Sequence, residues 1–496
     1  MKSYFLGIDQ GTTGVAAILF DEQWRQVSRG YRKLKQIYPR AGWVEHDAED
    51  IWQSVRAAVT EAMTAGNVAP EEVACIGIDH EGESVMLWDK QSGKPLGNTI
   101  VWQDRRTEAE AAALRDSHGA WFRERTGLFP DAYFSALKLK WLLDNTPEAP
   151  SLAAEGRLAA GTMDTWMLWN ITGGAVHATD VSTASRTMLM NLATETWDEE
   201  ILALLGIPAS ILPVIHDSAF VYGNSDKAAF CGITAPVSGI LTDQQAALFG
   251  HGCFSVGDIK ATYGTGCFLL MNTGDTPVYS DGGLITTVAW RIGGKTTYAL
   301  DGGIYIAGAA LGWLQNGLGI LENAPESEVM ARRAADNGGV YFVPAFSGLA
   351  APYCNPAARG TMVGLTAAVT KEHVVRATLE SIAYQVRDLV ELTARESAVP
   401  IPTMRCDGGL VNNGFLMQFQ ADMLGIPLAV PEITETTALG AAMMAALGIG
   451  VSETPEALGV PRNIRHTYEP QMKDDERQAL LKQWHKAVER AIEWAQ

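Results

Sequence analysis

The chain has 496 residues, of which 47% are hydrophobic and 19% charged, and its formal net charge is −19. This is a globular composition in a chain too long for one ordinary core, so we expect two domains of roughly 200–250 residues. The excess of acidic residues argues against a polyanion-binding surface, so nucleic acid is not an expected partner.

The cysteine and histidine usage indicates the cellular setting. Six cysteines are scattered without a CxxC pair, and nine histidines form no HxxxH cluster. This usage predicts reduced thiols in a cytoplasmic protein, because a disulfide framework or a zinc site needs closer spacing. No long apolar segment follows the N-terminus, and no run of about 18 apolar residues occurs, so we expect neither a signal peptide nor a membrane partner.

The first motif is a predicted hairpin near the N-terminus. An apolar run ends in Asp9, the turn Gly11-Thr12-Thr13-Gly14 follows, and residues 15–20 are apolar again. Backbone amides and hydroxyls of such a turn suit phosphate oxygens, and Asp9 suits a hydrated Mg²⁺. The turn is not a Walker A loop, because it lacks the GK[ST] ending and a following helix. Alone the motif is weak evidence, since Gly-Thr hairpins usually have only a structural role.

Predicted helices and strands alternate after this hairpin. Residues 49–65 have helical spacing, and residues 73–79 form an apolar strand. Residues 99–101 form another strand before a helix rich in Glu and Ala, and the segments 133–142 and 162–169 are helix-like. This alternation predicts an α/β sheet whose ligands bind at the carboxyl ends of the strands.

Asp243 follows a predicted strand, residues 233–241, and precedes residues 246–249, which suit a helix. A carboxylate at a strand end can take a proton from a hydroxyl as that hydroxyl attacks phosphorus. The alternative is a helix N-cap, which is the commoner role for an aspartate in this setting.

A second predicted hairpin, residues 259–272, repeats the strand–turn–strand pattern around Gly264-Thr265-Gly266. Two such turns, one in each half of the chain, can hold the phosphates of a nucleotide between two domains. We therefore expect an N-terminal domain over residues 1–252 and a C-terminal domain over residues 253–496.

Several later segments have two interpretations. Glycines at Gly308 and Gly409 precede helices, where they permit either the close approach of a base and ribose or tight packing of helices. Residues 374–393, 435–447 and 474–496 are helical patterns. The small residues of segment 438–446 suit either a packed helix or the interface of a homo-oligomer, a dimer or a tetramer, and packing is the favoured interpretation.

Taken together, these motifs resemble the FGGY family of carbohydrate kinases. The resemblance rests on Gly7 to Thr13, Asp243-Gln244-Gln245, Tyr263 to Gly266 and Asp407 to Gly409, and on the segments 133–145 and 360–380. It covers nearly the whole chain and fades only near the C-terminus. Within the family, residues 36–47 and 183–189 are most similar to the members that phosphorylate glycerol.

The resemblance implies an α/β fold of the actin–hexokinase (ribonuclease H-like) type, with ATP and a small polyol in an interdomain cleft. It makes Asp243 the general base and places Asp9 and Asp243 at the Mg²⁺. The positions that it implies for the polyol are Glu83, Trp102, Tyr133, Asp243, Gln244 and Phe268. The positions that it implies for the nucleotide are Thr12, Thr13, Gly14, Thr265 and Gly266 for phosphates, and Gly308, Gly409 and Asn413 for adenosine.

The chain departs from the glycerol-phosphorylating pattern at four places. Gly82 replaces a pocket arginine that donates to substrate hydroxyls, and the extra acid Glu81 stands beside it. A removed donor is expected to leave room and negative charge in the pocket. Ala16 and Gly312 replace polar residues near the nucleotide. Residues 228–231 lack the Gly and Arg of a sugar-bisphosphate inhibitor loop, so we expect no inhibition by fructose bisphosphate.

Three functions follow from these observations. The leading one is an ATP-dependent kinase for a primary hydroxyl of a small polyol. The second is a kinase for a four- or five-carbon sugar or sugar alcohol, which the change at Gly82 favours because a site that pairs particular hydroxyls discriminates by ~10⁴-fold or more. The third is a non-catalytic nucleotide switch of the same fold, which Asp243 and the aromatic residues Trp102, Tyr133 and Phe268 disfavour.

Overall fold

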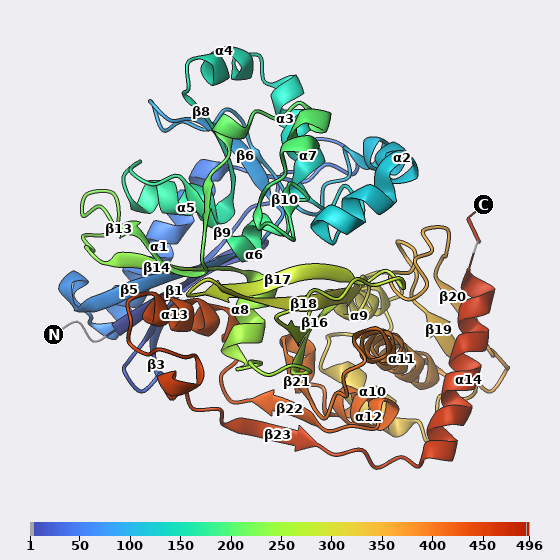
Figure 1. The fold of residues 1–496 in the computed structure, drawn as a ribbon. Helices are drawn as coiled ribbons and strands as arrows, with labels where there is room; N and C mark the ends of the chain where they lie inside the picture. The colour runs from blue at the N-terminus through green and yellow to red at the C-terminus, as the bar shows by residue number, and fades with distance from the viewer. Residues whose placement is uncertain (1–3, 493, 496) are drawn as a thin grey trace. The chain divides into compact units, whose positions relative to one another are not determined.

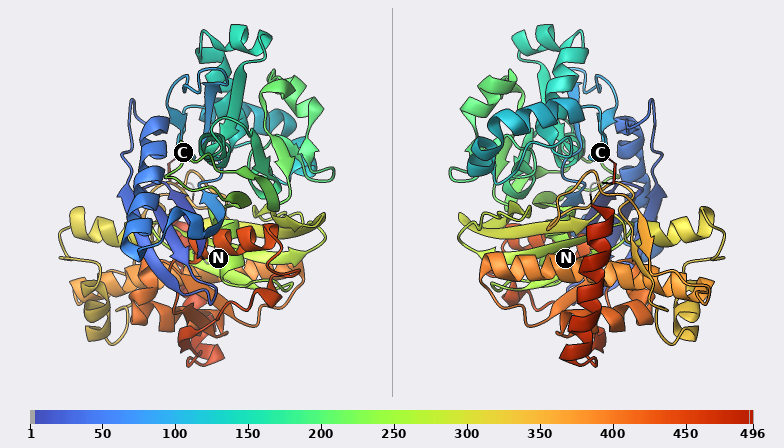
Figure 2. Two further views of the ribbon diagram at one scale, coloured as in Figure 1. Left: turned by 90° about the vertical axis from the view of Figure 1, so that its left-hand side faces the viewer. Right: turned by 90° about the vertical axis from the view of Figure 1, so that its right-hand side faces the viewer.

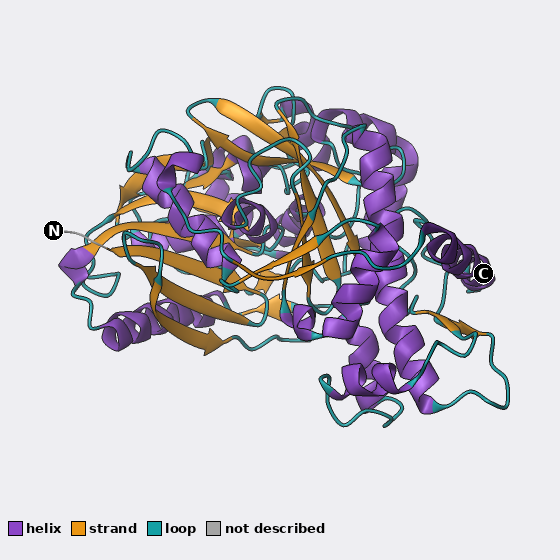
Figure 3. Ribbon diagram, turned by 90° about the horizontal axis from the view of Figure 1, so that it is seen from below, coloured by secondary structure: helices purple, strands orange, loops and turns teal. Residues whose placement is uncertain are grey.

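The computed structural model describes residues 4–492 and 494–495. They form two compact units, and neither unit is one continuous stretch of chain. Unit 1 comprises Met1–Phe254, Thr286–Tyr298 and Glu435–Pro461, and unit 2 comprises Ser255–Ile285, Ala299–Thr434 and Arg462–Gln496. Helices and strands alternate in both units (Figure 3), as the sequence predicts.

Unit 1 is built on a six-stranded sheet with the strand order β13-β14-β5-β1-β2-β3 (Figure 1). Its strands are β1 (Tyr4–Gly11), β2 (Gly14–Phe20), β3 (Gln26–Lys33), β5 (Val73–His80), β13 (Ala219–Asn224) and β14 (Pro236–Thr242). β1 and β2 form the predicted antiparallel hairpin, in which Gly11 pairs with Gly14. β5 lies between β1 and β14 and runs parallel to both, so the carboxyl ends of these three strands meet at one edge.

Two helices cover the two faces of this sheet. α1 (Ala48–Gly66) packs on β3 and β2, and its blue ribbon lies beside those strands in Figure 2. α13 (Thr436–Gly448) packs on β14, β5 and β1. It lies so close that a Cβ atom at Gly7, Gly77 or Gly239 would overlap the α13 backbone. α13 is buried along most of its length, so the packed-helix interpretation of residues 438–446 is confirmed.

The remainder of unit 1 forms smaller sheets and helices. A four-stranded sheet has the order β4-β7-β6-β8, and two-stranded sheets pair β10 with β11 and β12 with β9. These strands are β4 (Glu45–His46), β6 (Val85–Asp89), β7 (Thr99–Ile100), β8 (Leu158–Thr162), β9 (Ala178–Asp180), β10 (Met190–Asn191), β11 (Thr196–Trp197) and β12 (Val214–His216). The helices are α2 (Glu108–Thr126), α3 (Ser135–Asn145), α4 (Ala149–Ala154), α5 (Met163–Ile171), α6 (Val181–Ala184), α7 (Glu199–Leu205) and α8 (Asp243–Gly250).

The strands of unit 2 belong to a seven-stranded sheet with the order β17-β18-β16-β15-β21-β22-β23. Besides β17, its strands are β15 (Ile259–Tyr263), β16 (Cys267–Gly274), β18 (Lys295–Ile304), β21 (Met404–Asp407), β22 (Leu428–Pro431) and β23 (Ile464–Tyr468). β17 (Ile285–Ile292) precedes β18, and residues 286–298 of this hairpin belong to unit 1. β15 and β16 form the second predicted hairpin, and β21 runs parallel to both β15 and β22.

The helices of unit 2 pack around this sheet. They are α9 (Gly308–Asn316), α10 (Glu326–Arg333), α11 (Lys371–Ser397), α12 (Gly414–Leu424) and α14 (Asp474–Ala491), and β19 (Tyr341–Val343) pairs with β20 (Thr361–Val363). The right-hand view of Figure 2 shows α14 in red. Trp484 of α14 stacks on Tyr384 of α11 with ring centroids 5.3 Å apart. The predicted C-terminal helix therefore exists but ends at Ala491, and residues 493 and 496 of that prediction lie outside the described residues.

Two further predictions from the sequence concern disulfide bonds and membrane-spanning helices. All six cysteines are described, and all are free thiols. No helix within the described residues combines the length and apolarity that crossing a bilayer requires.

Candidate active site

Asp243 is the first residue of α8, directly after β14 ends at Thr242. The N-cap residue of α8 is Thr242, so the alternative assignment of Asp243 as an N-cap is wrong. Its Oδ1 accepts a hydrogen bond from the backbone N–H of Gln244 over 2.6 Å. The positive end of the helix dipole stabilises a carboxylate in this first turn. Asp243 is partly exposed, so its other oxygen face can reach a substrate hydroxyl.

The first Gly-Thr turn is tied to the aromatic residues of unit 1. Thr12 and Thr13 form the two-residue turn between β1 and β2, and Gly14 begins β2. The indole Nε1 of Trp102 donates to Thr12 Oγ1 over 2.8 Å. The turn predicted to bind phosphate and one of the residues predicted to bind the polyol are therefore joined by a direct hydrogen bond.

The predicted polyol wall is assembled in unit 1. The rings of Trp102 and Tyr133 meet edge to face, with centroids 5.7 Å apart and an interplanar angle of 87°. The buried ammonium of Lys138 donates to the Tyr133 carbonyl over 2.6 Å. Burial lowers the pKa of Lys138 to about 7, although Glu83 and Asp104 nearby oppose the shift. The wall is thus held in place from behind by a lysine of α3.

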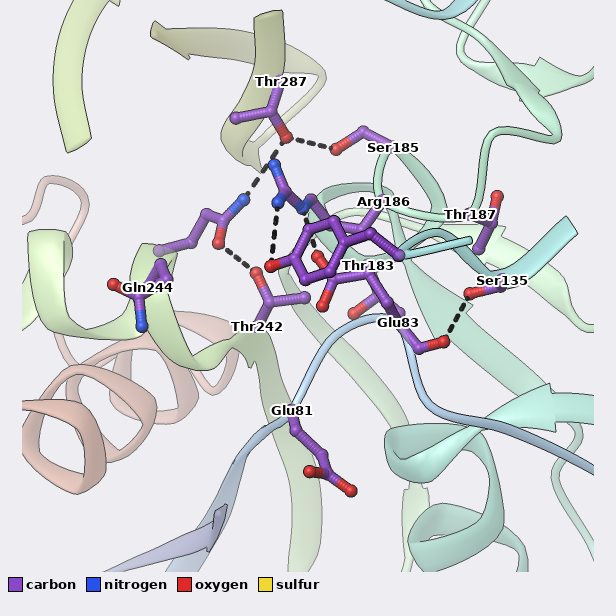
Figure 4. Close-up of polar contacts among 12 residues, drawn as sticks. Glu81, Glu83, Ser135, Thr183, Ser185, Arg186, Thr187, Thr242, Gln244 and Thr287 are labelled. Atoms are coloured by element: carbon purple, nitrogen blue, oxygen red, sulfur yellow. Dashed lines mark hydrogen bonds and ion pairs between the residues drawn. The ribbon is translucent and has the colours of Figure 1, made fainter. Parts of the chain in front are cut away.

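Glu83 is buried and paired with an arginine that the sequence analysis did not consider. Arg186 Nε donates to Glu83 Oε1 over 2.7 Å, and the two side chains are 4% and 6% exposed. Arg186 Nη2 also lies 3.5 Å from the Tyr133 hydroxyl. Figure 4 shows the Arg186 side chain beside Glu83, with Gln244 on the neighbouring helix. A guanidinium thus contacts two of the predicted polyol residues.

Gly82 lies against this cluster rather than beside empty space. A Cβ atom there would lie 2.8 Å from Thr242 Cγ2 and 3.5 Å from Arg186 Cγ. The space directly beside the α-carbon of Gly82 is therefore taken by Thr242 and the stem of Arg186. Glu81 is also buried, but its carboxylate lies 3.5 Å from His46 Nδ1 and points away from Glu83 in Figure 4.

The other predicted residues lie in unit 2. Phe268 is on β16, next to Gly303, where a Cβ atom would lie 2.8 Å from the phenyl ring. Thr265 and Gly266 form the second turn, and the backbone N–H groups of Ala307 and Ala309 donate to the Thr265 carbonyl. Gly308 begins α9 and donates to the Gly264 carbonyl over 3.0 Å. A Cβ atom at Gly308 would lie 2.7 Å from that carbonyl oxygen, so close packing requires this glycine.

Gly409 and Asn413 differ in their surroundings. Gly409 is exposed, and no atom lies within 4 Å of the position that a Cβ atom would take there, so a flat ligand can approach it closely. Asn413 is buried and is the N-cap of α12, where its side chain accepts from the Leu416 N–H over 2.9 Å. Its amide nitrogen donates to Ser327 Oγ over 3.2 Å. Asn413 therefore shapes the chain beside Gly409 through capping.

Acidic groups gather where β1, β5 and β14 end. Asp9 of β1 lies opposite Asp79 of β5, and Leu241, two residues before Asp243, is the β14 partner of Asp79. Thr437, in the first turn of α13, donates to Asp9 Oδ2 over 2.9 Å. Burial raises the pKa of Asp9, and burial together with the charges of Asp9 and Asp243 raises the pKa of Asp79 well above its usual range.

These carboxylates fit a hydrated divalent cation. Within the described ranges, no group of three or more His, Cys, Asp or Glu side chains is arranged to enclose a metal ion. Mg²⁺ does not need such a cage, because it keeps several waters and binds through one or two carboxylates plus substrate phosphates. The buried Asp79 carboxyl has no hydrogen-bond donor other than the carboxyl of Asp9, with which it interacts directly, and two acids this close are a setting that a cation would relieve.

Two family models match the chain, the N-terminal domain of the FGGY family of carbohydrate kinases at residues 4–250 and its C-terminal domain at residues 259–449. The chain belongs to the FGGY family of carbohydrate kinases.

Individual members of the family agree with this assignment. The chain is 50% identical to glycerol kinase 2 of Thermotoga maritima over 492 residues, which is 99% of each protein. The structure of Plasmodium falciparum glycerol kinase with ADP aligns with a TM-score of 0.93 and 34% identity over 98% of both chains. A ligand-bound xylulose kinase from Lactobacillus acidophilus shares the fold at 20% identity, with a TM-score of 0.87 over 98% and 97% of the two chains.

The FGGY kinase has the expected actin/hexokinase-like α/β fold, and it is an ATP-dependent phosphotransferase. Kinases of this kind need positioned groups and charge neutralisation more than covalent catalysis. Asp243 at a helix N-terminus, with Asp9 and Asp79 on the neighbouring strands, is the candidate for the positioned groups. The interpretation as a non-catalytic nucleotide switch has no support from the relatives.

Sequence reasoning did not single out two residues that the fold brings to the predicted site residues, Arg186 beside Glu83 and Asp79 beside Asp9. Arg186 meets Glu83 across 103 positions of sequence, and no local pattern marks that contact. Asp79 did have a signal, because the tripeptide Gly-Ile-Asp occurs both at residues 7–9 and at residues 77–79. Parallel strands with the same sequence in register place their aspartates side by side, so the repeat predicts the pair.

Proposed function

We propose that this FGGY kinase transfers the γ-phosphate of ATP to a primary hydroxyl of glycerol. The relatives at about half identity are named glycerol kinases. The observation that carries the proposal to this chain is the Arg186 guanidinium, which contacts both Glu83 and Tyr133. It supplies a cationic donor to the polyol pocket although position 82 is a glycine.

The packing at Gly82 supports a small substrate. The α-carbon of Gly82 lies against Thr242 and the stem of Arg186, so the loss of a side chain at position 82 has not enlarged the pocket there. The aromatic edge-to-face pair of Trp102 and Tyr133 suits a short carbon skeleton, and a few buried polar groups suit its hydroxyls. The main argument for a four- or five-carbon substrate was free space at Gly82, and the contacts of Gly82 weaken that argument.

The residues of unit 1 have the following proposed roles. Asp243 accepts the proton of the attacking hydroxyl, and the N-terminus of α8 keeps its carboxylate ionised until that step. Glu83, Trp102, Tyr133 and Gln244 orient the polyol so that one primary hydroxyl faces Asp243. Mg²⁺ would be held near Asp9 and Asp243 and would neutralise charge on the transferring phosphoryl group. Thr12, Thr13 and Gly14 bind phosphate oxygens through hydroxyls and amides.

The proposed roles in unit 2 concern the nucleotide, with the exception of Phe268, which we assign to the polyol. Thr265 and Gly266 bind phosphate oxygens, and Gly308 and Gly409 admit the adenosine at sites where a side chain would obstruct it. Asn413 fixes the loop at Gly409 through its cap. In this assignment the functional division falls between residues 1–252 and 253–496, although the compact units cross that division at residues 286–298 and 435–461.

The test is an ATP-coupled assay of the purified protein against glycerol, dihydroxyacetone, erythritol, threitol, xylitol, ribitol, erythrulose and xylulose. We expect the highest kcat/KM with glycerol, because Arg186 already fills the place of a pocket cation. Preference for a four- or five-carbon compound, with glycerol weak, would contradict the proposal. ATP hydrolysis that is independent of any polyol would contradict the kinase role itself.

A variant adds a second readout. Gly82→Arg should lower kcat/KM for glycerol at least about 10-fold, because the new side chain overlaps Thr242 and displaces Arg186. The matched control is Gly93→Arg, at a glycine with no atom within 4 Å of a Cβ position. An increase of glycerol activity in Gly82→Arg would show that the pocket lacks a donor after all.

A further inference from the structure

Arg106 is a buried arginine of unit 1 to which the proposed reaction assigns no role. It lies in the segment 101–107 between β7 and α2, four residues after Trp102, and its side chain is 1% exposed. Its guanidinium carbon Cζ lies 3.8 Å from the ring centroid of Trp43 and 4.5 Å from that of Trp141. Burying a guanidinium is unfavourable unless its donors are paired, so the partners of Arg106 show what it holds together.

Two acids pair with Arg106. Its Nε and Nη2 donate to the two carboxylate oxygens of Asp104, over 2.9 and 2.8 Å, and Nη2 also donates to Glu45 Oε1 over 2.6 Å. Asp104 is 0% exposed, and its Oδ2 accepts a further hydrogen bond from the Val44 N–H over 2.7 Å. This two-pronged pairing needs the planar guanidinium, because the ammonium of a lysine is a point charge without a fork.

These contacts join three parts of unit 1. Glu45 belongs to β4, Asp104 belongs to the segment 101–107, and Trp141 belongs to α3. Within the four-stranded sheet, β4 already pairs with β7, the strand that directly precedes this segment. Because backbone hydrogen bonds hold those two strands together, the contribution of Arg106 is the link between them and α3.

The two sides of this link carry the aromatic residues of the predicted polyol pocket. Trp102 is in the same segment as Arg106, and Tyr133 lies two residues before α3, whose Lys138 donates to the Tyr133 carbonyl over 2.6 Å. The Trp102 and Tyr133 rings meet edge to face with centroids 5.7 Å apart. The distance between these rings therefore depends on the position of α3 relative to the segment 101–107, which Arg106 fixes.

We propose that Arg106 is a positioning residue for the polyol, which acts by holding Trp102 against Tyr133. The inference rests on the proposed function, because that function assigns both aromatic residues to the polyol. Since the buried guanidinium supports this wall and takes no part in proton or phosphoryl transfer, its loss should raise KM for the polyol more than it lowers kcat.

The experiment compares the steady-state kinetics of Arg106→Lys and the native protein, with the polyol that the substrate screen ranks highest. The substitution keeps the positive charge and loses the fork and the stacked plane. We expect KM for the polyol to rise at least about 10-fold, with kcat and KM for ATP within about three-fold of the native values. Arg157→Lys is the matched control and should keep the native constants, because Arg157 also pairs with both oxygens of an aspartate, Asp89, at the same four-stranded sheet.

A double-variant cycle separates positioning from a general loss of structure. In Trp102→Ala the ring that Arg106 positions is gone, so adding Arg106→Lys should raise KM for the polyol by less than about two-fold. Equal fold-changes of KM in the native and Trp102→Ala backgrounds, or a native KM in folded Arg106→Lys, would overturn the inference.

Urea unfolding establishes which variants are folded. If Arg106→Lys does not fold, Glu45→Gln takes its place, because it removes one of the two acids that hold the guanidinium, and the same rise of KM over kcat is expected. Absence of polyol-dependent turnover in the native protein would instead refute the proposed function, so the two failures are distinguishable.

Discussion

Each unit places an acid at the same point of its sheet, but the two units surround it differently. In unit 1, β5 runs parallel to β1, and Asp79 pairs with Asp9. In unit 2, β21 runs parallel to β15, and Asp407 pairs with Thr262. In both units the first strand of the pair continues through a Gly-Thr turn into an antiparallel partner, so the local architecture repeats.

The two units differ at the residue two positions before Asp9 on β1 and before Thr262 on β15. In unit 2 this residue is Lys260, whose fully buried ammonium donates to Thr262 Oγ1 over 3.0 Å, at the residue opposite Asp407. In unit 1 it is Gly7, and the backbone of α13 occupies the space where a side chain would stand. Unit 2 therefore carries its own cation beside the acid. Unit 1 excludes a lysine from the equivalent position, and the cation that acts on Asp9 is Arg29 of the edge strand β3.

The largest expected effect comes from removing an acid of unit 1. Asp243→Asn should lower turnover about 10²–10⁴-fold and leave polyol affinity within a few-fold, because only the proton acceptor is lost. Steady-state kinetics with glycerol and ATP measure both quantities. Asp198→Asn, at the N-cap of α7, is the control for an aspartate at a helix N-terminus and should keep native turnover. A loss of only a few-fold in Asp243→Asn would remove Asp243 from the base role.

The Arg186 guanidinium lies at the predicted polyol wall of unit 1, and its removal is the next largest effect. Arg186→Met leaves Glu83 buried without its partner, and breaking such a pair costs about 3–5 kcal/mol. We expect kcat/KM for glycerol to fall about 10²-fold, mainly through KM. The double variant Arg186→Met with Glu83→Gln should be more stable than Arg186→Met alone in urea unfolding. Unchanged KM in Arg186→Met would show that Arg186 has only a structural role.

The comparison of Asp79 in unit 1 with Lys260 in unit 2 predicts changes of opposite sign in the free energy of unfolding. Lys260→Met removes the cation of unit 2 and should lower the free energy of unfolding by about 3 kcal/mol. Asp79→Asn removes a carboxyl group whose ionised form is disfavoured in the folded protein by burial and by Asp9, and should raise the free energy of unfolding by about 1 kcal/mol. Urea denaturation at neutral pH measures both values. Equal destabilisation of Lys260→Met and Asp79→Asn would contradict this prediction, because the two substitutions remove charges that we expect to have opposite effects on stability.

The effect that is smallest at neutral pH is a pH dependence at Lys138. The unfolded chain holds a proton on this lysine up to its ordinary pKa of 10.5, whereas in the folded protein burial lowers the pKa to about 7. Between these values the unfolded state binds more protons, so native stability rises with pH, and below pH 7 the full cost of the buried charge is present. Lys138→Met lacks this group, so the native protein should gain stability relative to the variant by at most about 1.4 kcal/mol per pH unit above about pH 7.

Urea midpoints at about pH 7, 8 and 9 give the stability difference between native protein and Lys138→Met. Lys140→Met is the matched control, because Lys140 lies on the same helix and pairs with Asp144, which raises its pKa. Its difference from the native protein should stay constant over this range. A constant difference for Lys138→Met as well would show that Lys138 stays protonated in the folded protein.

Local sequence patterns were sufficient for much of this fold. The two hairpins were predictable because Gly-Thr turns separate short apolar runs, and the strand–helix junction at Asp243 because apolar β14 ends in a polar step. The helices α1, α3, α5, α11 and α13 were predictable from spacing alone, and each extends within a few residues of the expected range. These elements share one property, which is that short-range periodicity determines them.

The rest depends on contacts between distant residues. The helix 435–447 was predictable, but its place under Gly7, Gly77 and Gly239 was not, because each glycine alone is compatible with any strand. Arg186 was overlooked because its partner Glu83 belongs to another segment. The loss of an arginine at Gly82 was interpreted as free room, since a sequence does not show that Thr242 closes that space.

The glycine-lined face under α13 also has a consequence for synthesis on the ribosome. The three strands that α13 covers are complete by Thr242, but the helix itself ends at Gly448. At about 5–20 residues per second, the nascent sheet waits on the order of 10–40 s for its covering helix, with an apolar glycine surface open to solvent. A polypeptide released at residue 254 would never acquire that cover, so truncated translation products of this gene should be aggregation-prone substrates for chaperones and proteases.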